Sequence, residues 1–281
     1  MVLAAYVPEG AKMKLCYTAL SPFCRKVRMA MEYKGLAFDV VEADAVHDIP
    51  AFNPRAEVPV LMDGDITVCN SADILGYLDR KFPDRPLYPA EATAYADVRE
   101  WERWADTHVD AVMTDLGVWK FAELPPMPDG LMEAGRREMN IAYDRLSERL
   151  TGRDFVCGAI SAADFAFYPH VASGAFIGLP FDPRRHAPVL EWMKRMRARP
   201  EGQNDLAYAR DWWANRAASP VDTQRINWGT YRLEWFLASG FHEFLFDQIR
   251  KDKVLWSTGP NNNAVHCKVK PEWFGRTVGA A

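Results

Sequence analysis

The sequence predicts an α/β sheet layer in its first third, followed by an all-helical part. Short apolar segments of strand length alternate with helical segments between residues 13 and 80, an order typical of a mixed sheet. Beyond residue 90 the apolar residues recur with the period of long amphipathic helices. The stretch from 83 to 89 is rich in proline and charge, so we expect the boundary between the two parts there.

The first part reads as strand, helix, strand, strand, strand and helix. The turn at Ser21 and Pro22 separates the first strand from the first helix, which Gly35 closes. Asp63 and Gly64 lie between two apolar runs and predict a hairpin. The predicted strands cover residues 13–19, 38–43, 58–62 and 66–68, and the predicted helices cover residues 23–33 and 71–80.

The second part reads as helices only. A proline-rich segment from 125 to 130 interrupts the helical pattern, and Pro200 ends the last predicted helix. The predicted helices cover residues 92–116, 131–150, 161–175 and 189–197. The chain is therefore divided into an N-terminal extension, a sheet domain, a helical domain and a C-terminal extension, at residues 1–12, 13–84, 90–215 and 216–281.

The C-terminal extension is rich in aromatic residues. Six of the ten tryptophans lie between Trp212 and Trp273, a composition that disordered tails do not have. One interpretation is a satellite core that wraps the helical domain. The other is an aromatic lid over a pocket, or a surface for a partner.

Composition excludes several classes of function. A net charge of −4 and a pI near 5.9 give no basic surface for nucleic acid. No stretch approaches the run of about 18 uncharged apolar residues that a membrane span needs, and the first residues do not read as a secretory signal, so we expect a cytoplasmic protein without a membrane partner. The five cysteines and six histidines show no metal-ligand spacing, so no metal is expected.

Four local motifs resemble the glutathione S-transferase superfamily. They are the segments 17–28 (YTALSPFCRKVR), 53–61 (NPRAEVPVL), 71–78 (SADILGYL) and 155–164 (FVCGAISAAD). The last one also has a direct physical meaning, because Ser161 and Asp164 have the spacing of a capping box at a helix start. The resemblance covers about residues 13 to 215. It implies a thioredoxin-like glutathione-binding domain followed by the family's all-helical domain, here with an aromatic-rich extension.

The resemblance places the catalytic hydroxyl at Ser21. Members of this family activate the thiol of glutathione as a thiolate, and a hydroxyl beside a helix N-terminus can stabilise that anion. The alternative is that Ser21 only caps the helix, with Pro22 in the first turn. Cys24 is a secondary candidate thiol, and a reductase or thiol transferase working through it would need an exposed thiol with a lowered pKa.

The same resemblance implies a glutathione site at Val58, Pro59, Asn70 and Ser71. The Val58–Pro59 bond is expected to be cis and to present the backbone of Val58 to the cysteinyl group of glutathione. Ser71 would bind the γ-glutamyl carboxylate at a helix N-terminus, unless it is simply an N-cap. The family has Glu or Gln where this sequence has Asn70, so a charge-assisted contact is lost or comes from another group.

The leading functional hypothesis is a glutathione-dependent transferase that attacks a small aromatic electrophile. The aromatic extension resembles that of bacterial β-aryl etherases of lignin breakdown, so cleavage of an aryl ether is the narrower reading. Substrate-pocket candidates are Trp104, His108, Thr114 and Trp119. The alternative is a non-catalytic subunit of a heterodimeric etherase. A dimer with itself or with a related subunit is expected in either case.

Overall fold

The structure is a computed structural model, and it describes residues 13–42, 53, 55, 57–120, 126–215, 226–227, 230–251 and 253–255. The predicted N-terminal extension, Pro54 of the second motif and most of the C-terminal extension lie outside these residues. None of the helices in the described ranges is both long and apolar enough to span a membrane.

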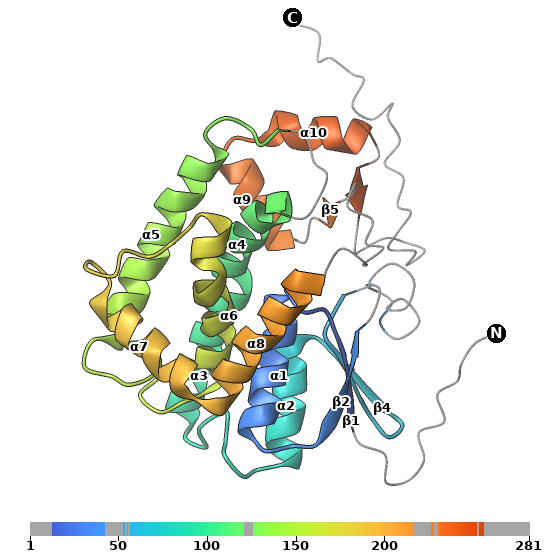
Figure 1. Cartoon of the computed structure of the whole chain (residues 1–281), viewed down its shortest axis with the longest axis vertical. Helices are drawn as coiled ribbons and strands as arrows, with labels where there is room; N and C mark the ends of the chain where they lie inside the picture. The colour runs from blue at the N-terminus through green and yellow to red at the C-terminus, as the bar shows by residue number, and fades with distance from the viewer. Residues whose placement is uncertain are drawn as a thin grey trace, which may run out of the picture.

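A four-stranded sheet forms the first layer. Its strands are β1 Met13–Tyr17, β2 Phe38–Glu42, β3 Val60–Asp63 and β4 Ile66–Cys69. They lie in the order β2-β1-β3-β4, with β1 parallel to β2 and antiparallel to β3, and with β3 antiparallel to β4. Two helices, α1 Pro22–Tyr33 and α2 Ser71–Lys81, lie between this sheet and the helical part (Figure 1). The predicted order of elements is confirmed.

The helical part differs from the prediction at two places. The helix expected over 92–116 is two helices joined by a π-helical turn, in which the Asp110 N–H bonds the Ala105 carbonyl. Pro200 ends one helix and also begins another, because a proline fits the first turn of a helix without losing a hydrogen bond. The helices are α3 Ala92–Trp104, the π-helical turn Ala105–Val109, α4 Asp110–Gly117, a short 3-10 helix Val118–Lys120, α5 Leu131–Leu150, α6 Ala162–Ile177, α7 Ala187–Ala198 and α8 Pro200–Asn215.

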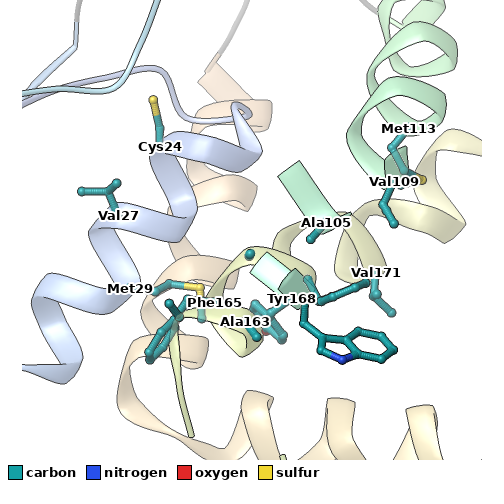
Figure 2. Packing of buried hydrophobic residues seen from close by; sticks show 14 of the residues in the cluster. Cys24, Val27, Met29, Ala105, Val109, Met113, Ala163, Phe165, Tyr168 and Val171 are labelled. Carbon is teal, nitrogen blue, oxygen red and sulfur yellow. The ribbon is translucent and has the colours of Figure 1, made fainter. Parts of the chain in front are cut away.

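The two parts share one hydrophobic core. Figure 2 shows side chains of α1 and of the helical part in this cluster, among them Cys24, Met29, Phe165 and Tyr168. A buried ion pair also crosses the boundary, because Arg25 donates two hydrogen bonds to the carboxylate of Asp205, at 2.9 and 2.7 Å. The position of α1 is therefore fixed from both sides.

The predicted capping box is present at the start of α6. The Asp164 carboxylate accepts the Ser161 N–H at 3.0 Å. It also accepts the N–H of Val156 and the indole N–H of Trp192, each at 2.9 Å. Asp164 is fully buried, so it ties the loop before α6 and the helix α7 to the start of α6.

The described part of the C-terminal extension packs on the helical part. It comprises helices α9 Thr230–Ala238 and α10 His242–Arg250, with a small parallel pair of strands, β5 Ile226–Asn227 and β6 Val254–Leu255. Phe236 is fully buried, and Arg232 makes a 2.8 Å ion pair with the buried Asp115 of α4. Figure 1 shows α9 beside α4. The packing of α9 agrees with the first interpretation of the extension, a satellite core that wraps the helical domain.

Candidate functional site

Ser21 lies between β1 and α1, at the N-cap of the helix. Its backbone is extended (φ −64°, ψ 120°), and its Oγ accepts the N–H of Cys24 at 3.3 Å. A serine hydroxyl has one proton to donate and two lone pairs to accept with. The cap uses only a lone pair. The Ser21 proton can hydrogen-bond the Cys24 sulfur, which is a weak acceptor in its thiol form, or be donated to an anion. The capping role and the proposed catalytic role are therefore compatible.

Cys24 is placed where its thiol is inert. The residue is fully buried, and its Sγ accepts the Thr18 N–H at 3.5 Å. Burial raises the pKa of the Cys24 thiol to about 11, and the hydrogen bonds from Ser21 and Thr18 lower it less. A nucleophilic cysteine needs the opposite environment. Cys24 has neither the exposure nor the lowered pKa that a redox role would require.

The Val58–Pro59 peptide bond is cis, as the family resemblance implied. Val58 is half-buried and Pro59 is buried, directly before β3. The Asn53 side chain bonds the Glu57 carbonyl at 2.8 Å, which closes the loop that leads into this bond. The contact of the Val58 backbone with glutathione stays a prediction.

Asn70 is the N-cap of α2 and is exposed. Its Oδ1 accepts the N–H groups of Ala72 at 3.0 Å and Asp73 at 3.4 Å. Its φ of 73° is in the left-handed region, which asparagine tolerates better than most residues. Because the amide oxygen already serves two donors, Asn70 is poorly placed to accept a hydrogen bond from an ammonium group.

Ser71 is the first residue of α2, and its side chain meets a buried lysine. Lys26 of α1 donates to the Ser71 Oγ at 3.3 Å and is itself fully buried. The same ammonium lies 2.7 Å from Glu102 Oε1 of α3 and 2.6 Å from Asp106 Oδ2 of the π-helical turn. This cluster joins α1, α2 and α3 at the N-terminus of α2.

Sequence reasoning did not identify Lys26 or Asp106. A signal was nevertheless present, because Arg25, Lys26 and Arg28 fall within one turn of α1, which lies between the sheet and the helical part (Figure 1). A helix enclosed in that way cannot expose three cations, and buried cations need partners of opposite charge. All three are buried in the structure.

Two of the substrate-pocket candidates face the helical core. The rings of Trp104 and His108 are stacked with centroids 5.8 Å apart, and Trp104 also lies 5.4 Å from Phe167 of α6. Arg145 of α5 lies over the Trp104 ring, and His108 pairs with Glu138 of α5 at 2.8 Å. These two side chains therefore contact α5 and α6, whereas the neighbouring Asp106 faces α1.

The other two pocket candidates lie further along the same helical run. Thr114 donates to Asp110 at 2.7 Å, and the ring of Trp119 lies 5.8 Å from Phe244 of α10. The role of the four candidates in a substrate pocket stays a prediction. Among the described residues, no three His, Cys, Asp or Glu side chains are grouped as a metal site would require.

Comparison by sequence places the first domain in a known family. A family model described as the glutathione S-transferase N-terminal domain matches residues 15–86. Glutathione S-transferase U1 of Arabidopsis thaliana is 32% identical over 49% of this chain and 60% of its own length. The chain covers 40%, 60% and 39% of the length of the first three curated relatives, so these matches concern parts of those proteins.

Comparison by structure extends the likeness into the helical part. A glutathione S-transferase from Methylobacterium radiotolerans, in complex with glutathione sulfonate, is 26% identical with a TM-score of 0.60, over 69% of this chain and 94% of that one. The β-etherase LigF from Sphingobium has a TM-score of 0.62 over 70% and 99%, and at 22% identity it shows the fold alone. The predicted fold class, a thioredoxin-like domain followed by an all-helical domain, is confirmed. The resemblance to the glutathione S-transferase superfamily is confirmed by the family model over residues 15–86 and by the fold over 69% of the chain.

Proposed function

We propose that this chain is a glutathione-dependent transferase in which the Ser21 hydroxyl stabilises the thiolate of bound glutathione. The observation that carries the proposal is the hydrogen bonding of Ser21. Its Oγ caps α1 by accepting the Cys24 N–H, so the cap does not use the hydroxyl proton, and an anionic ligand at the N-terminal end of the helix competes for that proton only with the neutral Cys24 thiol. The helix end adds a partial positive charge at the same place. Glutathione is then the co-substrate.

The reaction would be attack of the thiolate on an electrophilic carbon. The thiolate sulfur forms a bond to that carbon, and the leaving group departs with the electrons of the broken bond. Aromatic residues of the helical part and of α10 offer apolar contacts for an aromatic substrate. The narrower proposal is cleavage of a β-aryl ether, in which a phenolate leaves. Its support is the fold likeness to LigF.

A second candidate is a non-catalytic subunit that stabilises a related, active partner. The observation in its favour is Asn70, whose amide oxygen is occupied by the cap of α2 and which carries no charge for the γ-glutamyl ammonium. The curated relatives also include a stringent starvation protein A homolog from Histophilus somni, 34% identical over 38% of its length. This relative is named for a function other than glutathione transfer, which is consistent with a non-catalytic role.

The test is isothermal titration of the purified chain with glutathione, followed by a pH titration of the bound thiol through the ultraviolet absorbance of the thiolate. Removing one hydrogen bond to a charged group costs about 1.5–3 kcal/mol, so Ser21→Gly should raise the pKa of the bound thiol by about 1–2 units. We choose glycine because it replaces serine at a helix N-cap at little cost to stability, so the variant tests the hydroxyl and not the cap. Ser21→Thr keeps a hydroxyl, so the bound thiol should keep its lowered pKa in this variant.

Three outcomes separate the two candidates. Binding with a thiol pKa that rises in Ser21→Gly supports the transferase. Binding with an unchanged pKa removes Ser21 from the mechanism. Absence of binding at millimolar glutathione supports the non-catalytic subunit, and sedimentation with and without a co-purified relative would then show whether the dimer contains one kind of chain or two.

A further inference from the structure

We propose that Lys26 is the positioning residue of Ser71, holding its hydroxyl so that the proton is donated to the γ-glutamyl carboxylate of glutathione. This inference rests on the proposed function, because it concerns how the same glutathione would be recognised. Lys26 itself does not touch the ligand. It acts from behind the N-terminus of α2, from inside the protein.

The geometry of the ammonium fixes the direction of the Ser71 hydroxyl. Lys26 Nζ has three N–H donors and no lone pair to accept with. Three oxygen acceptors lie around it, at 2.6 Å on Asp106, 2.7 Å on Glu102 and 3.3 Å on Ser71. The Ser71 Oγ is therefore an acceptor in this bond, and its proton must be directed to a different group.

Ser71 consequently offers two donors at the start of α2. The first N–H groups of a helix have no acceptor within the helix. Asn70 Oδ1 accepts the N–H groups of Ala72 and Asp73, but not the N–H group of Ser71, which therefore remains available to a ligand at the helix N-terminus. An O–H and an N–H from one residue, next to a buried cation, match the two oxygens of a carboxylate.

The surrounding charges keep Lys26 in its donor form. Burial alone would lower the pKa of Lys26, but the attraction of Asp106 and Glu102 outweighs it and raises the pKa above its ordinary value. Glu102 is also held by Arg99 at 2.7 Å and by the Tyr88 hydroxyl at 2.9 Å. The ammonium is thus a permanent donor to Ser71 at neutral pH.

A purely structural role is the competing explanation, because Lys26 also neutralises two buried acids. Lys34, at the other end of α1, provides a matched control. Its ammonium is buried and pairs with Asp79 at 2.8 Å, and it bonds two backbone carbonyls, each at 3.0 Å. Lys34→Met removes a buried cation at the C-cap of α1 and Lys26→Met removes one within the helix, but only the second substitution removes a contact to Ser71.

The experiment compares two ligands on each variant by isothermal titration. One ligand is glutathione, and the other is its analogue with the γ-glutamyl α-carboxylate converted to an amide. We expect the wild type and Lys34→Met to prefer glutathione by about tenfold or more, the size of one hydrogen bond to a charged group. We expect Lys26→Met to lose most of this preference. Ser71→Ala should lose it equally, and the double variant should lose no more than Ser71→Ala does.

A second variant keeps the test valid if Lys26→Met does not fold. That substitution leaves Asp106 buried without a cation, whereas Glu102 keeps Arg99. Lys26→Met combined with Asp106→Asn removes the acid together with the base, and we expect it to lose the preference as well. The proposal is overturned if either Lys26 variant discriminates between the ligands as the wild type does, or if its effect adds to that of Ser71→Ala.

The outcomes also distinguish this inference from the proposed function. A wild type that binds neither ligand refutes the transferase, and the inference with it. A wild type that binds glutathione, with a preference that does not depend on Lys26, refutes only the role of Lys26.

Discussion

Substitution of Asp164 tests what stabilises this fold, because its one buried carboxylate accepts hydrogen bonds from two backbone N–H groups and one indole N–H group. It accepts from Val156 and Trp192 at 2.9 Å and from the Ser161 amide at 3.0 Å, and the residue has no exposed surface. Asp164→Ala removes every one of these acceptors at once.

The expected cost follows from the number of donors that lose a partner. Leaving a buried N–H without an acceptor costs about 1–3 kcal/mol. Three such donors, partly relieved by local relaxation, predict a loss of about 3–5 kcal/mol in the free energy of unfolding for Asp164→Ala. Trp192→Phe removes only the indole donor and leaves the carboxylate its other partners, so its loss should be about 1 kcal/mol, besides any change in packing.

The assay is equilibrium unfolding in urea, followed by fluorescence and circular dichroism. Asp154 is a matched control in the same segment, since its side chain is 77% exposed. Asp154→Ala should stay within about 0.5 kcal/mol of the wild type. The reasoning from donors left without an acceptor would be refuted if the free energy of unfolding of Asp164→Ala were less than about 1 kcal/mol below that of Asp154→Ala.

Two further predictions concern buried titratable groups. Cys24, with its pKa raised to about 11 by burial, should not react with iodoacetamide at pH 7 in the folded protein, and should react after unfolding; labelling in the native state, read by mass spectrometry, would contradict this. Burial raises the pKa of Asp110 to about 6, against the lowering effects of Thr114 and Arg232. The folded state then binds this proton more tightly than the unfolded state, so stability falls as pH rises from about 4 to 6. Asp110→Asn should remove this decrease, so above pH 6 its free energy of unfolding should exceed that of the wild type by about 1–3 kcal/mol. The prediction is refuted if the two free energies of unfolding change in parallel with pH.

Local patterns were sufficient to predict the sheet layer. Its strands are short apolar runs bounded by turn residues, and the hairpin around Asp63 and Gly64 connects β3 and β4 as expected. The π-helical turn could not be predicted, because an apolar pattern continues through it without interruption. The helix α8 was missed for a different reason. Pro200 can end a helix or begin one, and the sequence alone favoured the first.

The candidate site was predictable where it depends on neighbours in the sequence. The position of Ser21 at a helix N-cap and the cis bond before Pro59 follow from motifs of a few residues. The alternative that Ser71 is the N-cap of its helix is wrong, because Asn70 caps α2 and Ser71 is the first residue of the helix. The contact of Lys26 with Ser71 joins residues 45 positions apart, and its contact with Asp106 joins residues 80 apart. Neither the hydrophobic period nor a short motif can predict such a contact, because it forms only when α1 packs against α2 and against the helical part.

These long-range contacts change what Asn70 means for the function. The γ-glutamyl end of glutathione carries an ammonium and a carboxylate, and the residue that the family uses for the ammonium is replaced here by a helix cap. In the proposed site, recognition of the carboxylate does not depend on Asn70, because Ser71, positioned by Lys26, would provide it. In that proposed site, asparagine in place of the family's Glu or Gln at position 70 would therefore weaken only the half that binds the ammonium. A catalytic chain should bind glutathione chiefly through its α-carboxylate, whereas in a non-catalytic subunit the buried ammonium of Lys26 would serve only to neutralise Glu102 and Asp106.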